Sequence, residues 1–299
     1  MILVTGGLGM IGAHTARALV DLGHEVLVTA HRRTDVPSFL TGKVTVASLD
    51  VTDRDAFLAL GQQHEISDIV HLAGSIPEDP VDFFRTDMAG LLNALDAARA
   101  WGVRRFAVAS SLGVYIGRPE IPWREELDLP TTDLPHLILS FKKAVEPLTT
   151  HALSDSGVQP VVLRIGTIWG PLVDPESPFF HIPSFISAVL RGDPPPPLHA
   201  DDGGDCCYAP DAGRAIALLT TADTLRHNTY NVSSGRPFTN REFADALGSL
   251  DLLPGRQHGP GQDPYLDITR LTEDTGFTPA FDTAAAVVDY LAWRADNPR

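Results

Sequence analysis

The sequence predicts an α/β fold, a doubly wound parallel sheet followed by a smaller C-terminal cap. Up to about residue 170, short apolar runs alternate with longer segments of helical period, which is typical of parallel strands joined by crossover helices. Beyond that point prolines become frequent and interrupt the apolar runs. With 43% hydrophobic and 20% charged residues in 299, the chain has the composition of an ordinary globular protein.

The apolar runs predict strands and the periodic segments between them predict helices. Strands are expected at 2–5, 25–29, 44–47, 68–72, 106–110 and 161–165, and helices at 11–22, 53–64, 81–100 and 136–154. Pro147 is expected to start or kink a helix, and the proline-rich stretch 118–135 to form a loop. A sheet of this kind places its ligand crevice at the carboxyl ends of the strands.

The later part of the chain predicts shorter elements. These are helices at 211–219, 240–250 and 283–293 and a strand at 230–232. We therefore divide the chain into a nucleotide-binding domain at 1–170, with contributions from about 211–235, and a region at 171–299 that is mainly a substrate-binding cap and C-terminal helices. The apolar stretch that begins at Phe179 is expected to cover the substrate.

Charge and cysteine usage narrow the class of ligand. A net charge of −15 disfavours nucleic acid and anionic membranes, so a small molecule is the expected partner. The adjacent Cys206 and Cys207 exclude a disulfide framework, and the scattered histidines predict no metal site. The absence of an export signal and of an apolar run of ~20 residues predicts a cytoplasmic protein, either a monomer or a homodimer through the helices at 81–100 and 136–154.

A glycine-rich loop directly follows the first predicted strand and opens the first helix. Its residues are Gly6, Gly7, Leu8, Gly9, Met10, Ile11 and Gly12. Glycines at 6, 9 and 12 allow a tight turn, close approach of the backbone to a pyrophosphate and packing of helix on strand. The loop therefore predicts a Rossmann-type site for a dinucleotide.

The end of the second strand predicts which dinucleotide binds. An NAD-preferring site places a carboxylate there for the ribose 2′-hydroxyl, but this chain has Ala30, followed by His31, Arg32 and Arg33. Three potential cations suit a 2′-phosphate, so NADP(H) is favoured over NAD. The alternative is that the arginines form a solvated loop.

Several motifs resemble those of the extended short-chain dehydrogenase/reductases, the epimerase/dehydratase family. They are the glycine loop, 50–51, 71–74, 110–117, 163–171, 208–215 and 230–235. The resemblance implies that Asp50 and Val51 lie near the adenine of the cofactor. It also implies nicotinamide-side contacts from Leu72, Ala73, Gly74 and Lys142, and further cofactor contacts from Ala109, Ser110 and Ile165.

The family's catalytic set is a Ser or Thr and a Tyr-x-x-x-Lys motif, of which this chain retains only part. Ser111 matches the serine and Lys142 the lysine, but Ile138 stands where the tyrosine would be. The tyrosines at 115, 208, 230, 265 and 290 offer no other such motif. The predicted substrate contacts are Ser75, Ser111, Tyr115, Ile138 and Phe179.

The absence of the family tyrosine at position 138 guides the function that we expect. The chain resembles tyrosine-less members of antibiotic pathways, which implies an NADPH-dependent ketoreductase acting on a bulky aromatic polyketide ketone of the angucyclinone type. Its proton would come from Tyr115, His136, water or the substrate. The alternatives are a sugar-nucleotide epimerase or dehydratase, and a regulator that binds NADP without chemistry.

Overall fold

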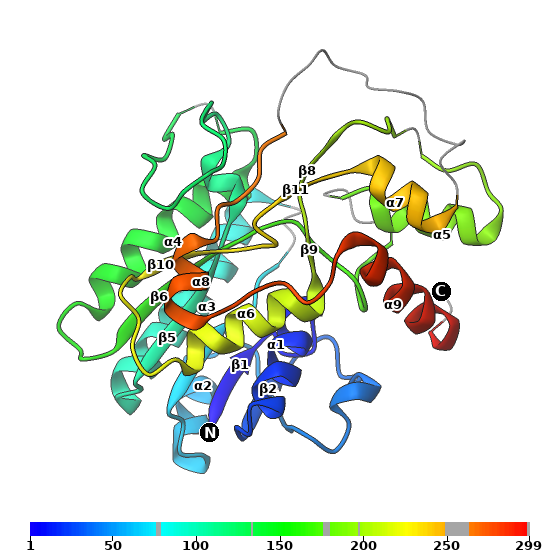
Figure 1. Ribbon diagram of the computed structural model, residues 1–299. Coiled ribbons are helices and arrows are strands. Elements are labelled where there is room, and N and C mark those ends of the chain that lie inside the picture. The colour runs from blue at the N-terminus through cyan, green and yellow to red at the C-terminus, as the bar shows by residue number, and fades with distance from the viewer. Residues whose placement is uncertain (76–78, 133, 176–179, 197, 249–262, 298–299) are drawn as a thin grey trace.

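A seven-stranded parallel sheet forms the centre of the computed structural model, which describes residues 1–75, 79–132, 134–175, 180–196, 198–248 and 263–297 (Figure 1). The strand order is β10-β6-β5-β4-β1-β2-β3. The strands are β1 (Ile2–Thr5), β2 (Val26–Ala30), β3 (Thr45–Ser48), β4 (Asp68–His71), β5 (Arg105–Ser111), β6 (Gln159–Ile165) and β10 (Thr229–Val232). The order reverses between β1 and β4, and ligands of doubly wound sheets bind at such a point.

Helices cover both faces of the sheet because alternate strand residues point to opposite sides. Helices α1 (Met10–Asp21) and α6 (Ala209–Thr221) share a core with Ile2 and Val4 of β1. Helices α2 (Arg54–Gln63), α3 (Pro80–Trp101) and α4 (Leu137–Leu153) enclose a second core that includes Leu3 of the same strand. The sheet is thus buried on both sides, as its continuous apolar strands predict, except at the edge strand β3, which is mostly exposed.

The cap packs around a separate aromatic core (Figure 1). Its elements are β7 (Ile168–Trp169), α5 (Ile182–Arg191), β8 (Gly203–Asp205), β9 (Cys207–Tyr208), β11 (Pro237–Thr239), α7 (Asn240–Leu247) and α9 (Thr283–Asp296). Trp169, Phe243 and Tyr290 are each almost fully buried there. Helix α8 (Thr269–Thr275) lies instead against α6 and β10 of the sheet domain.

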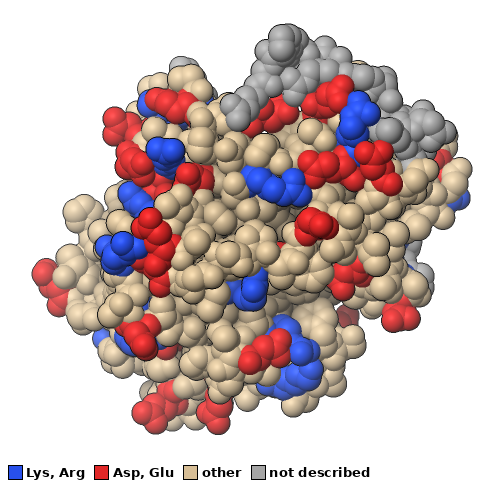
Figure 2. Space-filling view, in the orientation of Figure 1, with Lys and Arg blue, Asp and Glu red and all other residues tan. Residues whose placement is uncertain are grey.

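The surface carries mixed charges. Acidic and basic side chains are interspersed over the face drawn in Figure 2, in keeping with the net charge of −15. None of the helices in the described ranges is long and apolar enough to cross a membrane.

The predicted sheet and crossover helices are confirmed. Each predicted strand agrees with the structure to within two residues at either end, and the first four helices agree to within one. Helix α5 of the cap and helix α8 beside the sheet were not predicted. Residues 249–250 of one predicted helix lie outside the described ranges, and the division of the chain at residue 170 stays a prediction.

The expectation that Pro147 starts a helix is wrong, because this residue lies in the interior of α4. A proline there removes one backbone donor, which leaves the carbonyl of Lys143 without its usual partner. Burial of Val145, Glu146 and Thr149 around the proline compensates, since packing of a helix face outweighs local propensity.

A buried ion pair fixes α4 against the sheet. Arg164 of β6 donates two hydrogen bonds to Glu146 of α4, from Nε to Oε1 at 3.0 Å and from Nη2 to Oε2 at 2.8 Å. Ser110 of β5 donates a third bond to Oε1 at 2.6 Å. Nη1 of Arg164 donates to the hydroxyl of Tyr115 at 2.7 Å, and that hydroxyl donates to Asn231 of β10 at 2.9 Å. One network therefore connects α4 to three adjacent strands.

Removing one member of this pair is expected to destabilise the fold strongly, because the other charge would remain buried without its partner. Glu146→Ala should lower the free energy of unfolding by about 3–5 kcal/mol, measured by urea denaturation. Asp96→Ala is the matched control, since it breaks the exposed pair with Arg54 and should cost less than about 1 kcal/mol. Equal losses in the two variants would contradict the prediction.

Candidate functional site

The glycine loop connects β1 to α1 at the point where the strand order reverses. Gly6 has φ +66°, and a Cβ there would lie 2.9 Å from the amide nitrogen of Ala73. A Cβ on Gly12 would lie 2.3 Å from the carbonyl oxygen of Gly6, so packing alone requires glycine at both positions.

Gly9 has more free space around its Cα than Gly6 or Gly12. A Cβ there would approach only one protein atom, the carbonyl oxygen of Gly6 at 3.3 Å. Protein packing therefore restricts this position much less than Gly6 or Gly12, whereas a phosphate resting on the loop would need the space. Gly9 also precedes the first turn of α1, whose free amides and positive end face the same region. The loop thus fits a pyrophosphate.

The predicted adenine-side residues gather beside this loop. Nη1 of Arg33 donates to the carbonyl of Leu8 at 3.2 Å, and Nε2 of His31 lies 3.6 Å from Oδ2 of Asp50. Hydrogen bonds from Thr52 hold the pKa of Asp50 below its ordinary value, and the nearby charges of His31 and Arg32 act in the same direction. The carboxyl ends of β2 and β3 therefore form a polar rim with both signs of charge.

The predicted nicotinamide-side residues lie at the ends of β4, β5 and β6. The amide of Ala73 donates to Oγ1 of Thr5 at 3.3 Å, which joins this segment to β1. Nζ of Lys142 donates to the carbonyl oxygen of Ala109 at 2.8 Å, which brings α4 to the end of β5. Burial lowers the pKa of Lys142 from 10.5 to about 8.

Sequence reasoning did not single out Asp87 of α3, which lies in this region. Its carboxylate accepts hydrogen bonds from Oγ and the backbone amide of Ser75, at 2.7 and 3.2 Å. A small cavity bounded by Asp87, Lys142 and the buried His71 lies at the ends of β4 and β5. No sequence signal marked Asp87, because a carboxylate in a long amphipathic helix is usually only solvated.

Ser111 ends β5 and Ile138 lies in the first turn of α4, and the resemblance predicts that both face the reacting group of a substrate. Oγ of Ser111 accepts a bond from the amide of Gly113 at 3.1 Å, and among the described residues no acceptor takes its hydroxyl proton. Ile138 is half-buried against the core between α4 and the sheet. It precedes Lys142 by four residues, so both side chains lie on one face of the helix.

Two predicted substrate contacts receive no support from the geometry. Tyr115 is fully buried, its hydroxyl is held by Arg164 and Asn231, and burial raises its pKa to about 12. A phenol so enclosed has no open path to a substrate, and we withdraw it as a proton source. Phe179 lies outside the described residues.

Cys206 and Cys207 are both buried, and burial raises the pKa of each thiol well above its ordinary value. In the described ranges, no cluster of His, Cys, Asp or Glu side chains is arranged to hold a metal ion.

The comparison with protein families decides the class of the protein. The model of the NAD dependent epimerase/dehydratase family matches residues 2–233. The chain belongs to this family. The predicted resemblance is thereby confirmed, and with it the broad expectation of a nicotinamide-dependent enzyme of the oxidoreductase type.

Curated relatives and solved structures are similar over nearly the full length. A UDP-glucose 4-epimerase of Azospirillum brasilense is 31% identical, covering 98% of this chain and 91% of the relative. A dTDP-glucose 4,6-dehydratase of Streptomyces griseus is 28% identical, with 98% and 93% covered. The structure of a UDP-glucose-4-epimerase from Stenotrophomonas maltophila, with bound NAD and formylated UDP-arabinopyranose, has a TM-score of 0.85 at 21% identity and covers 99% of this chain and 98% of its own.

These comparisons contradict the expectation of a ketoreductase acting on an aromatic polyketide. The relatives are sugar-nucleotide epimerases and dehydratases, and none supports an angucyclinone ketoreductase. The expectation rested on the absent tyrosine, which indicates altered chemistry but carries no information about the substrate.

The pKa of Lys142 gives a test of its burial. The amine is expected to lose its proton at about pH 8 when folded but near pH 10.5 when unfolded. Between these values the unfolded chain holds more protons, so raising the pH should stabilise the wild type relative to Lys142→Met, by up to about 3 kcal/mol in urea denaturation.

Lys143→Met is the matched control, because Lys143 is the adjacent lysine of α4 and its Nζ donates to the carbonyl of Pro130, not to the end of β5. It should change this pH dependence little. A stability difference between the wild type and Lys142→Met that stays constant from pH 7.5 to 10.5 would contradict the burial of the amine at the site.

Proposed function

We propose that this protein binds NADP(H) and oxidises or reduces the sugar of a nucleotide-activated substrate, as an enzyme of the epimerase/dehydratase class. The observation that carries the proposal is the position of Lys142, whose ammonium lies 2.8 Å from the carbonyl of Ala109 at the carboxyl end of β5. Membership of the family and the sugar-nucleotide enzymes among the relatives support the choice of substrate.

The choice of NADP(H) rests on the charges beyond β2. The strand ends at Ala30, so no carboxylate is available there for the 2′-hydroxyl of an NAD ribose. His31 and Arg32 follow directly and are exposed, which leaves them accessible to a 2′-phosphate. Arg33 also reaches the glycine loop through the carbonyl of Leu8. The NAD in the solved structure named above is a property of that protein.

Each group at the site has a distinct role in this proposal. The bound nicotinamide supplies or accepts a hydride. The glycine loop and the first turn of α1 hold the pyrophosphate, and the Lys142 ammonium holds the hydroxyls of the nicotinamide ribose. Ser111 donates a hydrogen bond to the oxygen of the substrate, because its Oγ accepts from the amide of Gly113 while its hydroxyl proton has no acceptor among the described residues.

Ile138 defines how this site departs from the family pattern. An isoleucine cannot exchange a proton with the substrate, so proton transfer depends on Ser111 and on the adjacent Lys142. The lowered pKa of Lys142, about 8, lets its amine gain or lose a proton close to neutral pH. We therefore expect a slow enzyme.

Cofactor choice is tested by Arg32→Ala. Loss of the guanidinium should weaken NADP⁺ binding by roughly 10-fold or more, since a hydrogen bond between charged groups contributes about 1.5–3 kcal/mol. NAD⁺ binding should be unchanged. Both affinities are measured by calorimetry, with Arg54→Ala as a control that removes an exposed arginine of α2. A parallel loss for both cofactors would contradict the assignment.

Turnover is tested with UDP-glucose, UDP-galactose and dTDP-glucose in the presence of NADP⁺ or NAD⁺, with products followed by chromatography and NMR. We expect slow conversion of at least one nucleotide sugar. Ile138→Tyr should raise kcat by about 10²-fold or more, because general acid–base catalysis contributes roughly 10²–10⁴-fold. Ile138→Phe is the matched control, since it adds the ring without the hydroxyl.

A second candidate is a regulator that binds the cofactor without chemistry. It is favoured by the absence of a titratable group at Ile138 and by the burial of Tyr115. Tight cofactor binding with no conversion of any nucleotide sugar, by the wild type or by Ile138→Tyr, would favour the regulator and contradict the enzyme.

A further inference from the structure

Oxidation of a sugar hydroxyl at the candidate site requires a proton acceptor as well as a hydride acceptor. Ile138 cannot take up a proton. Ser111 is arranged as a donor, since its Oγ already accepts the amide of Gly113. Lys142 is mainly an ammonium at neutral pH, because its pKa is about 8, and an ammonium only donates hydrogen bonds. Another group must therefore accept the proton of the substrate.

The small cavity at the ends of β4 and β5 is bordered by two further titratable side chains, His71 and Asp87. Nδ1 of His71 lies 2.9 Å from Oγ1 of Thr5, and burial lowers the pKa of this imidazole to about 3. Because the imidazolium is so strongly disfavoured, His71 is a poor proton acceptor. Asp87 is the only carboxylate among the described residues that line this cavity.

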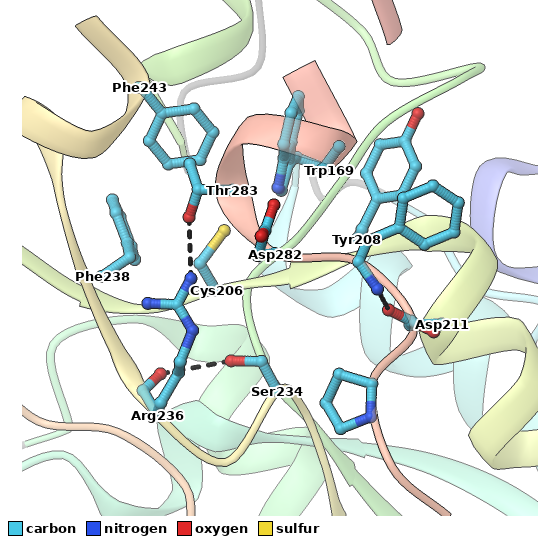
Figure 3. A pocket seen from close by; sticks show the side chains of 13 residues that line it. Trp169, Cys206, Tyr208, Asp211, Ser234, Arg236, Phe238, Phe243, Asp282 and Thr283 are labelled. Atoms are coloured by element: carbon cyan, nitrogen blue, oxygen red, sulfur yellow. Dashed lines mark hydrogen bonds between the residues drawn. The ribbon is translucent and has the colours of Figure 1, made fainter. Parts of the chain in front are cut away.

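A larger cavity in the C-terminal part of the protein, of about 310 Å³, offers no alternative acceptor (Figure 3). It is formed by β9 and its flanking residues, the turn between β10 and β11, α7 and the segment that enters α9. The two carboxylates in its described lining are already engaged, since Asp211 accepts two backbone amides and Asp282 caps α9. This C-terminal cavity shares no lining residue with the cavity at Lys142.

Asp87 acts on both of its polar neighbours. Its negative charge raises the pKa of Lys142, against the larger and opposite effect of burial, and so helps to keep this amine protonated. Its Oδ1 accepts the hydroxyl proton of Ser75 at 2.7 Å, and Oδ2 accepts the amide of Ser75 at 3.2 Å. The cavity itself, of about 10 Å³, has room for at most one water molecule. A substrate therefore reaches Asp87 only through Ser75.

Ser75 is placed to pass a proton to Asp87. It directly follows residues 72–74, which the resemblance assigns to the nicotinamide side, and it is itself a predicted substrate contact. Its Oγ donates to Asp87 and accepts no hydrogen bond from the part of the chain that the structure describes. A lone pair of this oxygen is thus available to the hydroxyl of a substrate.

We propose, on the basis of the function proposed above, that Asp87 is the proton acceptor of this site and that Ser75 relays the proton to it. In the oxidation, the carbinol of the substrate loses a hydride to the bound nicotinamide and its O–H proton to Oγ of Ser75, whose own proton passes to Oδ1 of Asp87. The electron pair of the O–H bond becomes the second bond of the carbonyl. In the reduction each transfer runs backwards, and Asp87, which is half-buried, exchanges its proton with solvent.

Steady-state kinetics with a nucleotide sugar that the wild type converts test this role. Asp87→Asn keeps an oxygen for Ser75 but removes the charge, and it should lower kcat by about 10²-fold or more, with little change in KM or in NADP⁺ affinity. Ser75→Ala should have a similar effect, whereas Ser75→Thr, which keeps the hydroxyl, should retain activity. Asp96→Asn is the matched control, because Asp96 lies on the same helix in an exposed pair with Arg54.

Ile138→Tyr separates proton transfer from a merely structural role of Asp87. A phenol at position 138 supplies its own proton acceptor, so Asp87→Asn should lower kcat much less in the Ile138→Tyr background than in the wild type. An equal loss in both backgrounds would show that Asp87 only holds the segment around Ser75, and would overturn the proposal.

The contact between Asp87 and Lys142 has a readout that needs no turnover. Without the carboxylate, the amine of Lys142 should lose its proton below the pH of about 8 that is expected in the wild type. The stability difference between Asp87→Asn and the double variant Asp87→Asn/Lys142→Met should therefore begin to depend on pH at a lower value, measured by urea denaturation. An unchanged value would overturn the placement of Asp87 beside the amine.

Failure of this proposal and failure of the proposed function give different results. If neither the wild type nor Ile138→Tyr converts any nucleotide sugar, the proposed function fails and the role of Asp87 fails with it. If the wild type converts a nucleotide sugar and Asp87→Asn keeps the same kcat, only the role of Asp87 is overturned.

Discussion

The buried pair between Arg164 and Glu146 is the interaction on which the geometry of the site depends. Two charges are tolerated in the interior because each makes several hydrogen bonds. Glu146 accepts from Arg164 and Ser110, and Arg164 donates to Glu146 and to Tyr115. The pair fixes the position of α4 relative to β5 and β6. Lys142 lies one helical turn before Glu146, so the same constraint directs its ammonium to the end of β5.

The face of α4 that presents Glu146 also contains Ile138, the residue that replaces the tyrosine of the family motif. Ile138, Lys142 and Glu146 follow one another at intervals of four residues. The structure keeps the anchor and the cofactor-side ammonium but has a hydrocarbon where a phenol is expected. A site that holds cofactor and substrate but lacks the phenol as a general acid should keep the rate contributions of binding and orientation. It should lose mainly the rate contribution of proton transfer.

Residues with a strict local requirement were predictable from the sequence. The apolar runs located the strands, and Gly6 and Gly12 located the loop, because no other residue fits beside Ala73 or the Gly6 carbonyl. Long-range pairing was not predictable. Tyr115 was expected to contact the substrate, but a short 3₁₀ turn directs it into a bond with Asn231, 116 positions away. The C-terminal cavity likewise unites segments that no local pattern connects.

A crystal structure of the complex with NADP⁺ tests the central claim most directly. The account predicts Nζ of Lys142 within about 2.7–3.2 Å of the hydroxyls of the nicotinamide ribose. It also predicts the 2′-phosphate beside Arg32 and an unchanged bond between Glu146 and Arg164. A cofactor bound with its nicotinamide ribose away from Lys142, or density for NADP⁺ elsewhere on the protein, would contradict the account.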